Sequence, residues 1–307
     1  MGKIRTILKK SRALTAIYPS YVKLKSKMRF WYMKLFTKTL TEEDLIAQFA
    51  KTGLQPGDTV MLHSSMSKIG ILEHGPATFV NALKRYIGPE GLIVVPTYPQ
   101  KGMYAYLENY QLFDVANTPS KDGAITEYLR KSEGAFRSAH PTHPVAAWGK
   151  GAEEFVAGHE KCKAPFAKGS PFEKLLLRNA KLMMVGVNFD HLTFIRTMED
   201  LDGDYKINPY IPGKIYHVPV KMTNGEIVMV DTPCHDPEFF SADRWNMRLF
   251  EDVKDMMTFS HIGKANCWVL NSQDLYRVEG ECAAKGKYPY YRYRFKDGVT
   301  ENYNENN

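Results

Sequence analysis

The chain has 307 residues, of which 44% are hydrophobic, enough for one large core or two smaller ones. Residues 1–40 contain eleven Lys and Arg and no acidic residue, so the rest of the chain carries 30 basic against 34 acidic residues, a net charge of −4. The overall charge of +7 therefore resides in the N-terminal segment, and we expect no nucleic-acid partner for the remainder.

The four cysteines also narrow the class of protein. They are Cys162, Cys234, Cys267 and Cys282, and none forms a C-x-x-C pair. We expect reduced thiols without a catalytic role in a cytoplasmic protein. No apolar run reaches the ~18 residues of a membrane-spanning helix, and the N-terminus lacks the apolar stretch of a signal peptide.

The N-terminal segment interleaves its basic residues with aromatic and aliphatic ones, such as Phe30 and Trp31. We interpret 1–40 as a basic extension that packs on the body or on a second subunit, which leaves a homodimer open. The alternative is a weak contact with a membrane surface. Residues 291–307 are expected to form a polar C-terminal tail.

The body opens with a helix and a strand–helix–strand unit. Thr41 and Asp44 have the spacing of a capping box, and Gly53 is a stop signal for that helix. Residues 59–64 and 92–98 are predicted to be buried strands, and 75–88 a helix between them. This order is typical of a parallel sheet.

Further strands are expected at 144–149, 182–187 and 265–270. Residues 214–230 are predicted to form a hairpin that turns at Asn224-Gly225. The fold class is therefore α/β, with a mixed central sheet, flanking helices and a C-terminal antiparallel hairpin.

The loop after the first buried strand, "HSSMSKIGILEHGP", carries hydroxyl and amine groups at Ser64, Ser65, Ser67 and Lys68. Ligands bind at the carboxyl edge of parallel strands, and helix N-termini suit phosphate. The loop lacks a Walker motif and G-x-G-x-x-G. A phosphate site and an ordinary strand–helix connection both remain open on this evidence.

Two histidines follow in "AFRSAHPTHPVAAWG". His140 and His143 are three residues apart, but Pro141 and Pro144 interrupt any helix that would align them on a metal. No third ligand motif lies nearby, so no metal site is predicted.

His159 follows a short predicted helix, where the helix dipole alone favours a histidine. It is therefore either a helix cap or a proton-transfer catalyst. Glu199 opens an acidic run that is solvated by default, but a carboxylate beside His159 would fix its tautomer.

Taken together, these segments resemble the aminoglycoside 3-N-acetyltransferase family, whose fold differs from that of the GNAT enzymes. The pieces that carry the resemblance include "LHSSMSKIG", "IGPEGLIVVPTY", "GAITEYLRK", "RSAHPTHPVAAWG", "GSPFEKLL", "LMMVGV" and "TFIRTMED". They follow the family order over about residues 42–275.

The resemblance implies a coenzyme A-dependent N-acyltransferase domain at 41–290, which uses acetyl-CoA or another short-chain acyl-CoA and a small-molecule amine acceptor. His159 would be the general base, with Glu199 orienting it, and transfer would be direct. The resemblance also places the Ser64–Gly70 loop and Ser170 on segments that contact coenzyme A. The residues expected to bind coenzyme A are His63, Ser64, Ser65, Ser67, Lys68, Gly70 and Ser170, and those expected at the acceptor are Arg196, Asp200 and Asp231.

The sequence departs from the family beside Glu199, where aminoglycoside enzymes usually have histidine and this chain has Arg196 and Thr197. Arg196 and the basic extension favour a nucleotide-linked amino sugar, as in surface-polysaccharide biosynthesis. The acidic run that begins at Glu199 favours the alternative, an aminoglycoside and a role in antibiotic resistance. An alternative of another class is a non-catalytic acyl-CoA-binding or membrane-associated scaffold.

Overall fold

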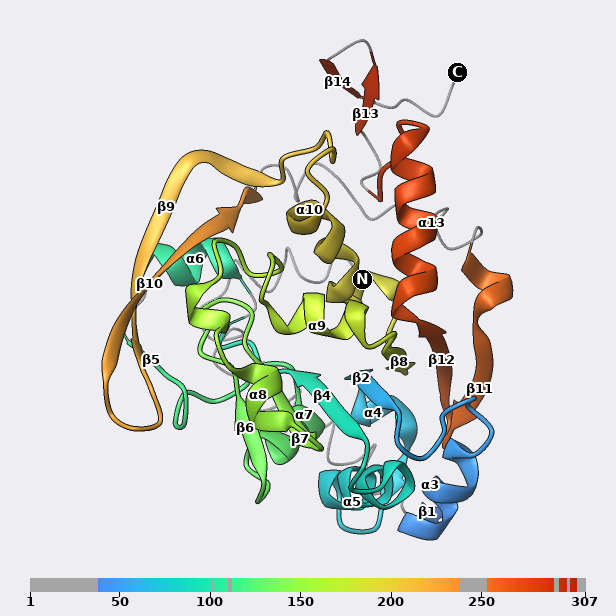
Figure 1. Cartoon of the computed structure of the whole chain (residues 1–307). Coiled ribbons are helices and arrows are strands. Elements are labelled where there is room, and N and C mark those ends of the chain that lie inside the picture. Colours follow the sequence, from blue (N-terminus) through green and yellow to red (C-terminus); the bar gives the residue numbers. More distant parts are fainter. Residues whose placement is uncertain are drawn as a thin grey trace, which may run out of the picture.

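A computed structural model describes residues 38–100, 102–109, 112–237 and 253–289, and the backbone of two short strands at 293–296 and 299–302. Its centre is a seven-stranded sheet in the order β11-β12-β8-β2-β4-β7-β6 (Figure 1). These strands are β2 (Thr59–Ser64), β4 (Leu92–Pro96), β6 (Ala135–Arg137), β7 (Val145–Gly149), β8 (Lys181–Val185), β11 (Thr258–Ile262) and β12 (Ala265–Asn271).

The sheet is mixed in a regular way. Its three central strands, β8, β2 and β4, are parallel to one another. On one side β7 runs antiparallel to β4, and on the other β12 runs antiparallel to β8. The predicted α/β class with a mixed central sheet is therefore confirmed.

Helices cover both faces of the sheet, which explains why its strands are apolar along their whole length. In β2, Val60 and Leu62 pack into one core with α3, α5 and α7, while Met61 packs into the other with α8, α9 and α13. The helices are α3 (Glu42–Phe49), α4 (Met66–Ile69), α5 (Pro76–Ile87), α6 (Met103–Glu108), α7 (Ala124–Arg130), α8 (Ala152–Val156), α9 (Pro171–Leu177), α10 (Thr197–Leu201) and α13 (Ser272–Ala284). Short 3-10 turns lie at His159–Lys161, Phe189–His191, Thr193–Arg196 and Lys254–Met256.

The first helix begins where its capping signal predicts. The Thr41 side chain accepts a hydrogen bond from the Asp44 N–H, and the Asp44 side chain accepts one from the Thr41 N–H. These two bonds satisfy donors that a helix N-terminus would otherwise leave unpaired. The helix ends at Phe49, before the predicted stop at Gly53.

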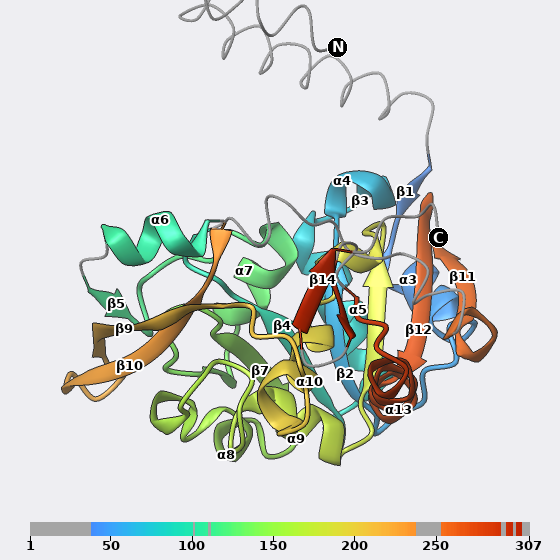
Figure 2. The same cartoon turned by 90° about the horizontal axis from the view of Figure 1, so that it is seen from above.

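The predicted hairpin is present as β9 (Tyr210–Lys221) and β10 (Ile227–His235), with Asn224-Gly225 in its turn. It does not join the main sheet. It pairs through β9 with β5 (Phe113–Asp114) in a separate three-stranded sheet. Figures 1 and 2 show this ribbon on the side of the molecule opposite α13.

The strand pairing places part of the predicted extension in the body. β1 (Thr39–Leu40) pairs with β3 (Ile71–Leu72). Residues 1–37, to which the expected membrane-surface or subunit contact belongs, lie outside the described residues. Within the predicted tail, β13 (Tyr293–Lys296) and β14 (Val299–Asn302) pair with each other. None of the helices in the described part of the chain is long and apolar enough to span a bilayer.

The pairing of β4 with β7 depends on a close approach of two backbones. Gly149 has φ 118°, and a Cβ at this position would lie 2.1 Å from the carbonyl oxygen of Gly91. Only glycine fits both the angle and the space. The fixed register places Pro96 opposite Val145, so the end of β4 lies beside the start of β7.

Candidate functional site

A cavity of about 880 Å³ lies at the edge of the sheet where β2, β4 and β8 end. Its lining includes residues at or just after the end of each strand: His63 to Ser65 at the end of β2, Tyr98 after β4, and Gly186 to Asn188 after β8. In open α/β sheets, ligands typically bind outside the carboxyl ends of the parallel strands. Because β7 is antiparallel, the residues before it reach the same edge, and His143 lines the cavity too.

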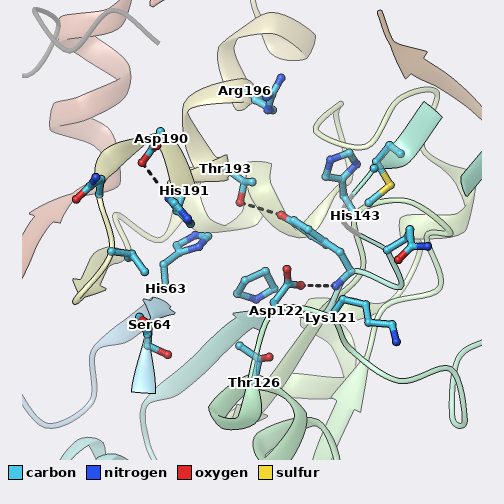
Figure 3. Close-up of a pocket in the computed structure, with 18 of the residues that line it drawn as sticks. His63, Ser64, Lys121, Asp122, Thr126, His143, Asp190, His191, Thr193 and Arg196 are labelled. Carbon is cyan, nitrogen blue, oxygen red and sulfur yellow. Dashed lines mark hydrogen bonds and ion pairs between the residues drawn. The ribbon is translucent and has the colours of Figure 1, made fainter. Parts of the chain in front are cut away.

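The cavity has the following lining residues besides those: Lys68, Pro96, Gln100, Gly102, Met103, Tyr104, Ala105, Lys121, Asp122, Thr126, Asp190, His191, Thr193, Arg196, His235 and Pro237. Figure 3 shows His63 and His191 together on one side of this space and His143 on the other, with Thr193 between them.

The predicted coenzyme A loop lies only partly on the cavity. His63, Ser64, Ser65 and Lys68 line it, whereas Ser67 and Gly70 do not. Ser67 reaches the site indirectly, because its Oγ lies 3.3 Å from the Oγ of Ser65.

Gly186 allows this loop to lie close to the end of β8. A Cβ at Gly186 would approach the Lys68 Cβ to 3.0 Å, and the residue has φ +66°. A larger residue would therefore push the loop away from the cavity. Glycine is favoured at this position because of its backbone angle and its lack of a side chain.

His159 does not line the cavity. It is fully buried, its Nδ1 lies 2.9 Å from Ser138 Oγ, and its Nε2 donates to the carbonyl oxygen of Pro165 at 2.8 Å. Burial lowers the pKa of its imidazole to about 3. Both ring nitrogens are engaged within the protein, so the structure gives His159 the surroundings of a structural residue, and its catalytic role stays a prediction.

Glu199, predicted to orient His159, contacts a different histidine in this structure. Oε2 of Glu199 lies 3.3 Å from Nε2 of His235, and Oε1 is buried without a hydrogen-bond partner among the described residues. Burial raises the pKa of Glu199 to about 8. Sequence distance could not show that the hairpin strand β10 supplies the histidine next to this carboxyl group.

Asp200 and Asp231, predicted to bind the acceptor, lie outside the cavity lining. Asp200 accepts hydrogen bonds from the N–H of Phe166 at 2.9 Å and from the hydroxyl of Tyr210 at 2.9 Å. Asp231 is exposed on the hairpin and pairs with His217 at 2.6 Å. Of the three predicted acceptor residues, only Arg196 lines the cavity.

Ser170, predicted to contact coenzyme A, is fully buried as the N-cap of α9, where its Oγ accepts from the Glu173 N–H at 3.2 Å. It is also absent from the cavity lining. The Gly169-Ser170-Pro171 sequence is therefore explained by helix capping, with Pro171 in the first helical turn.

Sequence reasoning missed several polar residues of the cavity. Tyr98 donates its hydroxyl proton to Thr193 Oγ1 at 2.8 Å, and its N–H donates to Asp122 at 2.6 Å. His143 was considered only as a metal ligand. The one available signal was its position immediately before a buried strand at the edge of the sheet.

Two chemical properties follow for the cavity. Its histidines include His63, whose pKa burial lowers to about 3, and His143 and His235, whose pKa burial holds well below the usual value. They are therefore neutral at physiological pH, and each neutral ring has one nitrogen that carries a lone pair. Among the described residues, no group of three or more His, Cys, Asp or Glu side chains is placed to hold a metal ion.

Comparisons with known proteins agree with this arrangement. The family model for aminoglycoside 3-N-acetyltransferases matches residues 61–282. The chain is 31% identical to aminoglycoside N(3)-acetyltransferase VII of Streptomyces paromomycinus, over 54% of this chain and 60% of that protein. It is 29% identical to aminoglycoside N(3)-acetyltransferase III of Acinetobacter baumannii, over 76% of this chain and 88% of that protein.

Solved structures show the same fold. The structure of AAC-VIa bound to sisomicin is 26% identical and has a TM-score of 0.65, with 78% of this chain and 96% of that chain covered. The binary complex of AAC-IIIb with coenzyme A is 23% identical and has a TM-score of 0.63, with 78% of this chain and 95% of that chain covered. Since the family model spans well over half of the sequence, the chain belongs to the aminoglycoside 3-N-acetyltransferase family and is an acetyl-CoA-dependent amine N-acetyltransferase.

Proposed function

We propose that this protein transfers the acetyl group of acetyl-CoA to an amino group of an aminoglycoside. The observation that carries the proposal is one continuous cavity, lined at β2 by hydroxyl groups and Lys68 and across from it by a neutral histidine, His143. For acetyl transfer, the acetyl thioester and the acceptor amine must be bound in the same cavity at the same time. A cavity of about 880 Å³ is at the upper end of ordinary ligand sites.

The residues at the β2 side suit the donor. Ser64, Ser65 and Lys68 offer hydroxyl and ammonium groups to phosphate oxygens. Burial leaves Nε2 of His63 without a hydrogen-bond partner among the described residues. This nitrogen is sealed from the cavity, so the polar groups that face the donor are those of Ser64, Ser65 and Lys68.

The acceptor side carries charges of both signs. The carboxylate of Asp122 and the cations of Lys121 and Arg196 line the cavity there. A carboxylate at this wall suits an ammonium group of an aminoglycoside. The aminoglycoside is proposed in place of the nucleotide-linked amino sugar preferred from the sequence, because the matching family and relatives are aminoglycoside N(3)-acetyltransferases.

The test is the release of coenzyme A thiol from acetyl-CoA in the presence of sisomicin, gentamicin or apramycin, with a nucleotide-linked amino sugar in a parallel reaction. We expect acceptor-dependent release with at least one aminoglycoside, and mass spectrometry of the product should show one added acetyl group. Release with the nucleotide-linked sugar, at a kcat/KM more than about tenfold higher, would overturn the proposal; tenfold corresponds to about 1.4 kcal/mol of differential transition-state binding.

A further inference from the structure

His143 is held rigidly at the wall of the cavity. It lies between Pro141 and Pro144 and immediately before β7, and its ring packs against Tyr98 and Phe166, each at a centroid distance of 4.9 Å. The residue is 6% exposed and lines the cavity. A side chain confined in this way can present one fixed edge to a bound molecule.

The hydrogen bonds behind the ring specify which nitrogen carries the proton. Two backbone N–H groups, of Thr142 and His143, point at Nδ1 of His140 at 3.3 and 3.4 Å. That Nδ1 must therefore be a bare acceptor, because a proton there would face two other donors. Burial, together with the neighbouring His159 and His143, holds the pKa of His140 well below its usual value, so this ring stays neutral.

The Thr142 hydroxyl links the Nδ1 atoms of His140 and His143. Its Oγ1 lies 3.1 Å from Nδ1 of His140, to which it can only donate. The same Oγ1 lies 2.9 Å from Nδ1 of His143, so a hydroxyl that donates to His140 accepts a hydrogen bond from Nδ1–H of His143. His143 is then protonated at Nδ1, and its Nε2 is left with a free lone pair.

Nothing in the described part of the chain occupies that lone pair. Nε2 of His143 forms no hydrogen bond with the described residues. It also keeps some solvent exposure, unlike the buried unpaired nitrogen of His63. The other cavity histidines differ. Nε2 of His63 is sealed, and Nε2 of His235 contacts Glu199. His191 pairs with Asp190 through Nδ1, but its side chain is 60% exposed and is not held in place as that of His143 is.

We propose that Nε2 of His143 is the base that accepts the amine proton during acetyl transfer, and that Thr142 and His140 are positioning residues that fix its tautomer. This inference rests on the proposed acetyl transfer. The neutral amine attacks the thioester carbonyl carbon, so that a C–N bond forms and the C–S bond breaks. The amine proton moves to Nε2, and the imidazolium returns it to the departing thiolate, which leaves as the thiol.

The first test uses variants of the full chain. His143→Asn keeps an N–H donor near the Nδ1 position but has no counterpart of Nε2, and His143→Gln is a second variant in case the first is unstable. We expect kcat to fall by about 10²–10⁴ while KM for acetyl-CoA changes little. The control, His261→Asn on the edge strand β11, should retain full turnover. A His143→Asn enzyme that folds and keeps kcat within threefold of the unaltered enzyme would overturn the proposal.

The relay has its own test. Thr142→Val keeps the shape of the side chain and removes the hydroxyl, so we expect kcat to fall by about tenfold, whereas Thr142→Ser should restore turnover to within about twofold. A purely structural role for Thr142 would not distinguish hydroxyl from methyl in this way. Equal loss in both variants, or in neither, would contradict the relay.

The tautomer can also be observed without any acceptor. In protein carrying ¹⁵N-labelled histidine, the nitrogen signals of His143, assigned by comparison with His143→Asn, should show a protonated Nδ1 and an unprotonated Nε2. The opposite tautomer would refute the relay. Failure of the proposed function is distinguishable, because it appears as no acceptor-dependent thiol release in the unaltered enzyme.

Discussion

His159 and His143 are both buried and both neutral, yet their surroundings differ in one decisive respect. His159 has protein partners on both ring nitrogens, Ser138 and Pro165. His143 has a partner on Nδ1 only, and its ring borders the cavity. Burial and a lowered pKa therefore do not identify a catalytic histidine. The free nitrogen and its access to substrate do.

The largest expected effect is the loss of folding stability when His159 is replaced. His159→Leu leaves the Ser138 hydroxyl and the Pro165 carbonyl buried without their partner, so we expect the free energy of unfolding to fall by about 2–4 kcal/mol. Urea unfolding measures this, and turnover is then determined per folded molecule.

The two histidines should separate in these measurements. Folded His159→Leu should keep kcat within a few-fold, whereas folded His143→Asn should not. If His159→Leu left stability unchanged and abolished turnover, the assignment of the base would move back to His159.

A second effect concerns the pH dependence of stability. Because the pKa of Glu199 in the folded protein, about 8, lies above the ordinary value of 4.5, its contribution to stability is complete below pH 4.5 and is lost as the pH rises through 8. Glu199→Gln has no such titration. We therefore expect the unaltered protein to lose more stability than Glu199→Gln between pH 5 and pH 8.5, measured by urea unfolding at each pH. Parallel curves would contradict a protonated Glu199.

A smaller effect is expected at the donor loop. Ser65→Ala removes one hydroxyl from the cavity lining, which is worth about 0.5–1.5 kcal/mol for a single hydrogen bond, or about two- to tenfold in KM for acetyl-CoA. Initial rates at varied acetyl-CoA and varied acceptor separate the two KM values. Ser67→Ala, outside the lining, should have less effect. A rise in the acceptor KM instead would place this loop at the acceptor.

The smallest effect is expected at Asp231, which the sequence analysis assigned to the acceptor site. It is exposed on the hairpin and pairs with an equally exposed His217, and surface ion pairs of this kind contribute about 0–1 kcal/mol. Asp231→Asn should leave kcat/KM within about twofold in the thiol-release assay. A loss above tenfold would mean that the hairpin closes over the acceptor.

The elements that sequence patterns predicted are those with local signals. The capping pair Thr41 and Asp44, the apolar strands such as 59–64, and the Asn224-Gly225 turn each record a short-range preference of the backbone. Strand direction has no such signal. The antiparallel course of β7 and the separate sheet of β9, β10 and β5 follow from tertiary packing, because an apolar run buried on both faces fits a parallel or an antiparallel neighbour.

The site was predictable in the same uneven way. The loop beginning at His63 was found because a strand end followed by hydroxyl groups is a local pattern. The histidine that Glu199 contacts comes from β10, 36 residues further along the chain, and no local pattern could indicate that pairing. The prolines around His143 correctly indicated that this segment is not a helix. They did not predict that the segment places His143 at the cavity.

The connections that meet at the cavity differ greatly in length. Only seven residues, Ser138 to Pro144, join β6 to β7, and they hold His143 between two paired strands. The path from Pro96 to Ala124 is much longer and contributes Tyr98, Met103 and Lys121 to the cavity wall. Insertions and substitutions in the long path would reshape the acceptor wall and leave the short turn in place. The fold thus allows substrate range to evolve separately from the chemistry, which is the condition under which one enzyme lineage can follow a changing set of antibiotics.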